Sequence, residues 1–254
     1  QTRNDRSRIL ELGSSSARFR VPSPEDAGAN PNGQDSEYLP LVPHDDPIYN
    51  DGDLFCADFE QLADGRILAV GGTDYYAEPY VGEVAGERYG LIELEGVKAA
   101  RVFDPYTETW SQAGSMEYGR WYPSLITLPS GRLLALSGVS KVIKPVYPER
   151  PVDSGTNVRQ LETFDPATGT WMTSASGANR SLPLYPRVHL LPNGNVYYDA
   201  AGQVYNPLGA SYDEAFWNIA ATFDPVAQRW NDLGVPGLGL GALPGLPDLP
   251  GDNG

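Results

Sequence analysis

Phe103-Asp104-Pro105-Tyr106-Thr107-Glu108-Thr109-Trp110 is the stretch that decides the fold, because two similar stretches follow it in the chain. Every copy starts with Phe-Asp-Pro and has a Trp six residues after the Asp. The later copies begin at Phe164 and Phe223. Sequence that recurs at a nearly constant period indicates a repeat architecture, in which each copy is one structural unit.

A second motif, Leu-x-x-Gly, precedes each copy, at 62–65, 128–131 and 191–194. Its Asp-Gly, Ser-Gly and Asn-Gly pairs can adopt the positive φ that a tight hairpin needs. Short apolar runs follow at 66–70 and 132–136. We interpret these runs as buried strands, because they are too short for helices. The Asp-Pro pairs mark another turn, so each unit is expected to be a four-stranded antiparallel meander.

These units predict an all-β fold. A four-stranded sheet cannot bury both faces alone, so such units stack radially as the blades of a propeller. The period of about sixty residues exceeds the roughly 50 of a kelch repeat. We assign the excess to loops at 73–96 and 139–159, where a binding surface would be elaborated.

The number of blades is the next constraint. About three and a half blades leave two open edges, whereas propellers close with roughly 4–8 blades. We therefore expect a kelch-type β-propeller with seven blades, of which this chain is a fragment. The remaining half would be a separate chain or a cleaved segment. A complete four-bladed propeller with swapped strands is the alternative. We expect residues 1–53 to hold two strands of a preceding blade, at 8–12 and 17–21, and then a long connection. Residues 54–233 are expected to form three blades, at 54–113, 120–173 and 184–232. Residues 234–254 are expected to be a Gly/Pro/Leu-rich linker or docking tail.

Composition limits the partners and the compartment. The chain has 254 residues, a formal charge of −15 and a pI near 4.4. This acidity argues against nucleic acid and anionic membrane as partners. No apolar run approaches the length of a membrane span. The single Cys rules out an internal disulfide framework. We expect an extracellular, periplasmic or cell-surface protein.

The residue nine positions before each turn glycine is Cys56, Tyr122 or Tyr185. These positions are equivalent and fall at the start of the first strand of each blade, which lines the central axis. Cys56 and Tyr122, on adjacent blades, are therefore expected to be in contact at one end of the channel. Taken singly, a lone Cys is usually a small buried hydrophobe and a Tyr usually packs. The shared phase is what favours a functional pair.

Three segments resemble the galactose oxidase and glyoxal oxidase family of radical copper oxidases, over about 54–232. They are Leu54-Phe55-Cys56 with the 62–66 turn, Gly119-Arg120-Trp121-Tyr122-Pro123-Ser124, and 184–192. The resemblance implies that Cys56 and Tyr122 are joined by a thioether bond and form the catalytic redox cofactor. Tyr122 would also ligate one copper ion. The implied reaction oxidises a primary alcohol or hydrated aldehyde by two electrons, and O₂ becomes H₂O₂.

The chain also departs from that family. The family's axial Tyr-His pair and its second His have no counterpart here, so the other copper ligands are expected outside this chain. His44 falls in the long connection, and His189 is expected to be structural. Asp58 stands where the family usually has Gly, and Ser140 stands where galactose oxidase has a Trp over the thioether.

Two other functions remain open. One is a non-catalytic propeller that serves as a structural module of a cell-surface assembly. The other is a carbohydrate-binding propeller that uses the aromatic-rich segment 75–80.

Overall fold

The structure is a computed structural model. It describes residues 9–13, 16–20, 54, 56–144, 155–202 and 218–235. Within these residues the fold is built from antiparallel strands, and its helical content is one 3-10 turn, η2 (Ser176–Ala178). The all-β expectation is confirmed. The expected connection at 22–53 and the tail from 236 lie outside the described residues.

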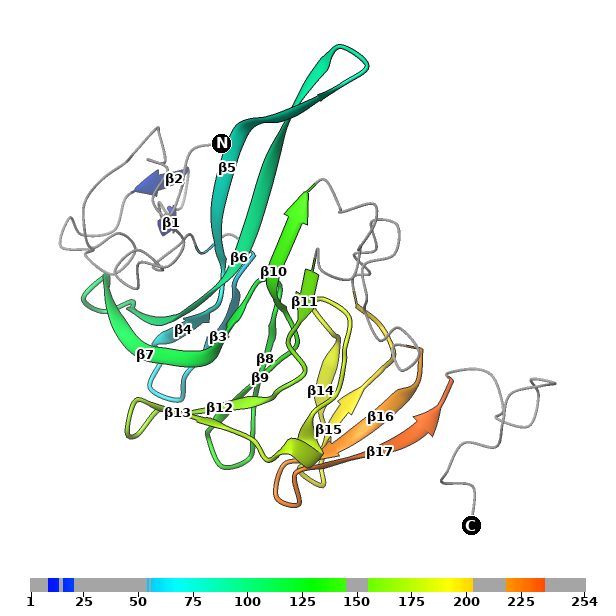
Figure 1. The fold of residues 1–254 in the computed structure, drawn as a ribbon. Coiled ribbons are helices and arrows are strands. Elements are labelled where there is room, and N and C mark those ends of the chain that lie inside the picture. The colour runs from blue at the N-terminus through cyan, green and yellow to red at the C-terminus, as the bar shows by residue number, and fades with distance from the viewer. Residues whose placement is uncertain are drawn as a thin grey trace.

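Three four-stranded meanders follow one another along the chain and stand side by side (Figure 1). The first consists of β3 (Asp58–Gln61), β4 (Ile67–Val70), β6 (Glu87–Asp104) and β7 (Thr109–Arg120). The second consists of β8 (Ser124–Thr127), β9 (Leu133–Leu136), β12 (Glu162–Asp165) and β13 (Thr170–Thr173). The third consists of β14 (Val188–Leu190), β15 (Val196–Tyr198), β16 (Ala220–Asp224) and β17 (Arg229–Gly234). A separate hairpin joins β1 (Ile9–Leu12) to β2 (Ala17–Arg20).

The Leu-x-x-Gly motif forms the same turn in all three meanders. In each copy the Gly amide donates to the Leu carbonyl at 2.9 Å. The glycines Gly65, Gly131 and Gly194 have φ of 91°, 79° and 87°. This left-handed backbone is the conformation that glycine adopts without steric cost. The turn chemistry read from the sequence is therefore confirmed.

The Phe-Asp-Pro-to-Trp motif joins the third strand of each meander to the fourth. The Asp side chain closes the turn: Asp104 Oδ1 accepts the amide of Tyr106 at 2.8 Å, and Asp165 and Asp224 do the same in their turns. The Trp then stands opposite the Phe, with ring centroids 5.1–5.2 Å apart in the three copies. The constant spacing reflects this cross-strand pair.

Adjacent meanders pack face to face through apolar clusters. The cluster between the first and second includes Leu68, Val102, Leu133 and Phe164, with Trp171 at its edge. The cluster between the second and third is its counterpart. It includes Leu134, Leu182, Val196, Tyr198 and Phe223, with Trp230 at its edge. Each sheet thus buries a face against its neighbour, as the sequence argument requires.

The long insertions differ from the expectation of loops at 73–96 and 139–159. β5 (Thr73–Val84) pairs with β6 in a long hairpin that projects from the first meander (Figure 1). β10 (Val139–Lys144) pairs with the other edge of β6 and with β11 (Gly155–Asn157). The insertions pair with each other because β6 continues past the meander and offers both of its edges.

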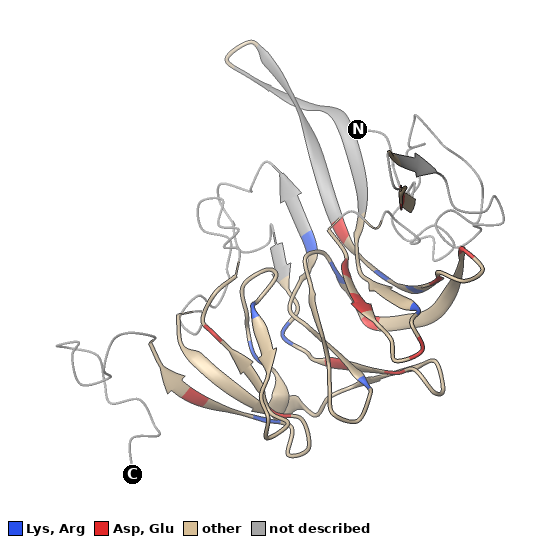
Figure 2. Ribbon diagram, turned by 180° about the vertical axis from the view of Figure 1, so that it is seen from behind, with Lys and Arg blue, Asp and Glu red and all other residues tan. Residues whose placement is uncertain are grey.

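The described Lys and Arg residues are distributed along the three meanders, interspersed with Asp and Glu (Figure 2). No helix in the described part of the chain has the length and apolar character needed to cross a membrane.

Candidate active site

Cys56, Tyr122 and Tyr185 share an unusual backbone conformation. Their φ values are 63°, 61° and 46°. Residues other than Gly rarely adopt positive φ, and each such residue costs about 1–3 kcal/mol, which surrounding contacts must offset. Strain of this kind is concentrated at functional sites. The three residues that occupy equivalent positions in the repeats therefore also share one backbone conformation.

Backbone hydrogen bonds connect the three residues in sequence order. The Tyr122 amide donates to the Cys56 carbonyl at 3.0 Å, and the Tyr185 amide donates to the Tyr122 carbonyl at 3.0 Å. Each bond joins one meander to the next at the entrance of its first strand. The side chains are consequently brought to the same end of the three sheets.

The Cys56 thiol and the Tyr122 hydroxyl are hydrogen-bonded to each other. Burial raises the pKa of Cys56, and the neighbouring Tyr122 and Trp121 side chains oppose this increase. Burial also raises the pKa of Tyr122 to about 12, and the hydrogen bond with Cys56 adds to the increase. The Trp121 ring lies over Tyr122, with centroids 4.3 Å apart. The expected contact is confirmed, whereas the thioether bond and the catalytic roles stay predictions.

Tyr185 completes the cluster, although we predicted no functional role for it from the sequence. Its ring meets Tyr122 edge to face, with centroids 4.7 Å apart. Its hydroxyl donates to the carbonyl of Ala57, the residue after Cys56, at 3.1 Å. Burial raises the pKa of Tyr185, and the nearby Cys56 thiol adds to the increase. The signal that could have found it was its phase, which matches that of Cys56 and Tyr122.

Two acidic side chains of β3 bind the neighbouring strand β8. Asp58 Oδ2 accepts the Leu125 amide at 2.7 Å. Glu60 Oε1 accepts the Thr127 hydroxyl at 2.7 Å. Burial raises the pKa of Asp58, and the Leu125 amide opposes that increase. Asp58, which departs from the family pattern, thus fixes the strand that starts beside Cys56 against the strand that starts beside Tyr122.

A buried ion pair holds the segment that leads into Tyr122. Arg120 and Glu162 are 0% exposed, and Arg120 Nη2 lies 2.7 Å from Glu162 Oε2. The same guanidinium donates to the carbonyls of Ser137 and Gln160 at 2.6 and 2.8 Å. Burial lowers the pKa of Arg120, and Glu162 opposes this effect. The pair crosses from the first meander to the second.

Glycine allows close packing around the same segment. The Gly72 amide donates to the Arg120 carbonyl at 2.9 Å. A Cβ at Gly71, whose φ is 74°, would collide with that carbonyl oxygen. Trp121 pairs with Val139 through reciprocal backbone bonds of 2.9 and 2.8 Å. The backbone before Tyr122 is therefore held on both sides.

Two of the other candidate residues, His189 and Ser140, lie in the part of the chain that the structure describes. His189 is 60% exposed and its Nε2 lies 3.7 Å from Asp199 Oδ2. Ser140, on β10, is half-buried. His44 lies outside the described residues, as do the side chains of the 75–80 segment.

The described residues do not form a copper site on their own. No group of three or more His, Cys, Asp or Glu side chains among them could hold a metal ion. Copper in proteins is well served by imidazole ligands. Tyr122 stays the predicted copper ligand, and any further ligands are expected outside the described residues.

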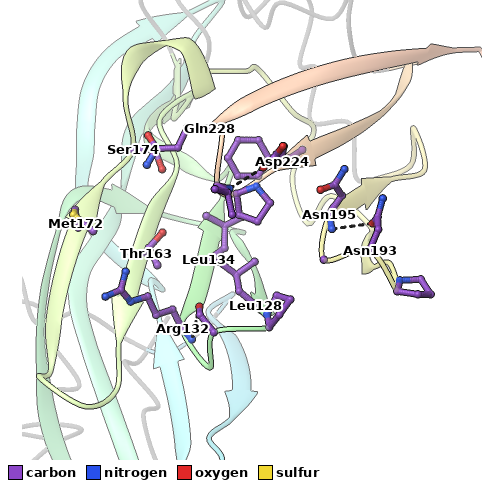
Figure 3. Close-up of a pocket in the computed structure, with 17 residues that line it drawn as sticks. Leu128, Arg132, Leu134, Thr163, Met172, Ser174, Asn193, Asn195, Asp224 and Gln228 are labelled. Atoms are coloured by element: carbon purple, nitrogen blue, oxygen red, sulfur yellow. Dashed lines mark hydrogen bonds between the residues drawn. The ribbon is translucent and has the colours of Figure 1, made fainter.

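A groove of about 830 Å³ lies away from the cluster (Figure 3). It is bounded by the Leu-x-x-Gly turns of the second and third meanders and by the Asp-Pro turn of the third. Leu128, Arg132, Asn193 and Gln228 are among its lining residues. The first strand of the second meander, β8, has Tyr122 before its start and this groove at its end.

Comparisons with known proteins agree with the resemblance seen in the sequence. The chain is 28% identical over 180 residues to "Aldehyde oxidase GLOX" of Vitis pseudoreticulata, a match that covers 68% of this chain and 27% of that protein. It is 26% identical over 158 residues to "Putative aldehyde oxidase Art an 7" of Artemisia annua, covering 59% of this chain and 22% of that protein. The chain thus matches only about a quarter of the length of these relatives. No protein-family profile matches it.

A solved structure of a fungal alcohol oxidase of the AA5 family, in complex with copper, also aligns with this chain. Its sequence identity is 18% and the TM-score is 0.45, over 74% of this chain and 31% of the oxidase. The similarity at this level is too weak to locate a site.

Proposed function

We propose that this chain carries the Cys56–Tyr122 half of the active site of a copper radical oxidase. The observation that carries the proposal is the hydrogen-bonded contact of a thiol and a phenol, on adjacent meanders, at strained equivalent positions. The similarity to two proteins named as aldehyde oxidases supports the same reading. We further propose that the three meanders are consecutive blades of a larger kelch-type propeller, seven-bladed and exported from the cytoplasm.

The cofactor would form by oxidation of the two side chains. A thioether breaks the S–H bond of Cys56 and a ring C–H bond of Tyr122, and it forms one C–S bond. The two electrons and two protons released would reduce one O₂ to H₂O₂. The hydrogen bond between the two side chains holds the sulfur beside the phenol, which is the arrangement this step needs.

The proposed reaction is RCH(OH)₂ + O₂ → RCOOH + H₂O₂ for a hydrated aldehyde, or RCH₂OH + O₂ → RCHO + H₂O₂ for a primary alcohol. A bound copper ion would supply one-electron chemistry with O₂. Tyr122, once linked to Cys56, would give and regain the second electron. Trp121 and Tyr185 pack on the phenol ring and would limit the access of water to it.

The test is H₂O₂ release by the full-length, copper-loaded protein on small aldehydes and primary alcohols. Tyr122→Phe and Cys56→Ser should abolish it. Tyr106→Phe is the matched control, because Tyr106 is 82% exposed in the Asp-Pro turn of the first meander and its loss should leave turnover unchanged. Equal turnover in wild type and Tyr122→Phe would overturn the proposal.

The second candidate is a non-catalytic propeller that binds carbohydrate or a structural partner. This candidate would be supported if the full-length protein released no H₂O₂ and bound no stoichiometric copper, yet bound polysaccharide.

A further inference from the structure

We propose that Tyr185 is a positioning residue that holds the Cys56 segment against Tyr122. This inference extends the proposed function, because it names a third residue that sets the geometry of the same site. Tyr185 comes from the third meander, whereas Cys56 and Tyr122 precede the first strands of the first and second. One residue therefore bridges both members of the pair.

Two contacts fix Tyr185 to Tyr122. Its amide donates to the Tyr122 carbonyl at 3.0 Å, and its ring meets the Tyr122 ring edge to face at 4.7 Å. Edge-to-face pairs of aromatic rings have a defined relative orientation. Both the backbone and the side chain of Tyr185 are thus set by Tyr122.

A third contact fixes Tyr185 to the Cys56 segment. The Tyr185 hydroxyl donates to the Ala57 carbonyl at 3.1 Å. Ala57 is 6% exposed, and its own amide closes a turn onto the Leu54 carbonyl at 3.0 Å. The hydroxyl therefore binds the Ala57–Asp58 peptide group, one residue beyond Cys56, whose own φ is the strained 63°. A strained conformation persists only when surrounding contacts determine it, and this hydrogen bond is one such contact.

The consequence concerns the Cys56 side chain. With the hydroxyl in place, the Ala57 carbonyl is held to Tyr185, whose amide is bound to the Tyr122 carbonyl, and the thiol stays beside the phenol. Without it, the segment keeps its bond from the Tyr122 amide to the Cys56 carbonyl and the contact of Asp58 with Leu125, but it loses the one contact that holds the Ala57 carbonyl to Tyr185. The thiol then becomes more accessible to solvent.

The test is the rate of Cys56 alkylation by iodoacetamide in the full-length, copper-free protein. The rate is followed on the Cys56 peptide by mass spectrometry, at a pH above the thiol's pKa so that it reports access. Tyr185→Phe removes the hydroxyl and keeps the ring. It should raise the rate about fivefold, the factor that corresponds to loss of one ordinary hydrogen bond. The melting temperature should stay close to that of wild type.

Tyr198→Phe is the matched control, because Tyr198 is a buried tyrosine on β15 of the same meander. It should leave the alkylation rate unchanged. An unchanged rate in Tyr185→Phe, or equal acceleration in both variants, overturns the inference. The result is separable from the oxidase proposal, since alkylation needs no copper and no turnover. A faster rate in Tyr185→Phe together with inactive copper-loaded wild type would uphold the positioning role and reject the oxidase.

Discussion

The amide of Tyr122 donates to the carbonyl of Cys56 at 3.0 Å, although 65 residues separate the two in the chain. The bond joins equivalent points of two successive repeats. It places a thiol and a phenol side by side, and the residues around them hold the arrangement through buried charge, close glycine packing and acidic side chains. Each of these supports can be removed separately.

Loss of the buried Arg120–Glu162 pair should be strongly destabilising when only one partner is removed. Arg120→Met leaves the Glu162 carboxylate buried without its counter-charge, which costs about 3–5 kcal/mol. The double variant Arg120→Met/Glu162→Leu should recover part of that loss, because an apolar pair needs no counter-charge. Urea unfolding of the full chain measures both.

The control for that prediction is Arg132→Met. Arg132 and Asp165 form an ion pair at 3.0 Å, but their side chains are 46% and 24% exposed. Pairs near the surface contribute about 0–1 kcal/mol. A similar loss for Arg120→Met and Arg132→Met would show that the Arg120 pair is not the support described above.

Gly71→Ala should be more damaging than Gly131→Ala. Both glycines have positive φ, 74° and 79°, so both variants meet the cost of about 1–2 kcal/mol that a left-handed backbone imposes on other residues. Only at Gly71 would the new Cβ collide with the Arg120 carbonyl, whereas Gly131 has nothing within 4 Å. Unfolding free energies for the two variants check the difference. Equal losses of unfolding free energy in the two variants would show that the close packing of Gly71 on the Arg120 carbonyl does not contribute to stability.

Stability should fall in acid through the Asp-Pro turns. The Ala227 and Val226 amides lower the pKa of Asp224 below its ordinary 3.8. A lowered folded-state pKa gives stability that is present above the unfolded value and is lost as pH falls through the folded value. The Asp224→Asn variant should therefore be less stable than wild type at neutral pH, and the difference in stability should shrink as the pH drops below about 4. Thermal midpoints between neutral and acid pH measure this gap, and a constant gap would contradict the assignment.

The sequence predicted the parts of the structure that repeat. The Leu-x-x-Gly and Phe-Asp-Pro motifs mark turns whose chemistry is local, so their strands and the cross-strand Phe–Trp pairs could be placed from spacing alone. The Cys56–Tyr122 contact followed from the same phase, because equivalent positions in stacked repeats adjoin.

The parts that do not repeat were beyond sequence reasoning. Pairing of Glu95 on β6 with Lys141 on β10 joins two insertions that share no motif. Glu162 faces Arg120 from another meander, and in the third repeat the corresponding residue, Ala221, carries no charge. Asp58 stands where the family usually has Gly, and nothing in the sequence indicates that its carboxylate binds the next meander. Long-range polar contacts of this kind depend on side-chain positions that a period does not specify.

The most direct test of the central claim is the mass of the peptide spanning 50–125 from full-length protein after exposure to copper and O₂. We expect a mass lower by two hydrogens than that of the unlinked peptide, with Cys56 resistant to alkylation and both effects absent in Tyr122→Phe. Full mass and a freely alkylated Cys56 in copper-loaded wild type would contradict it.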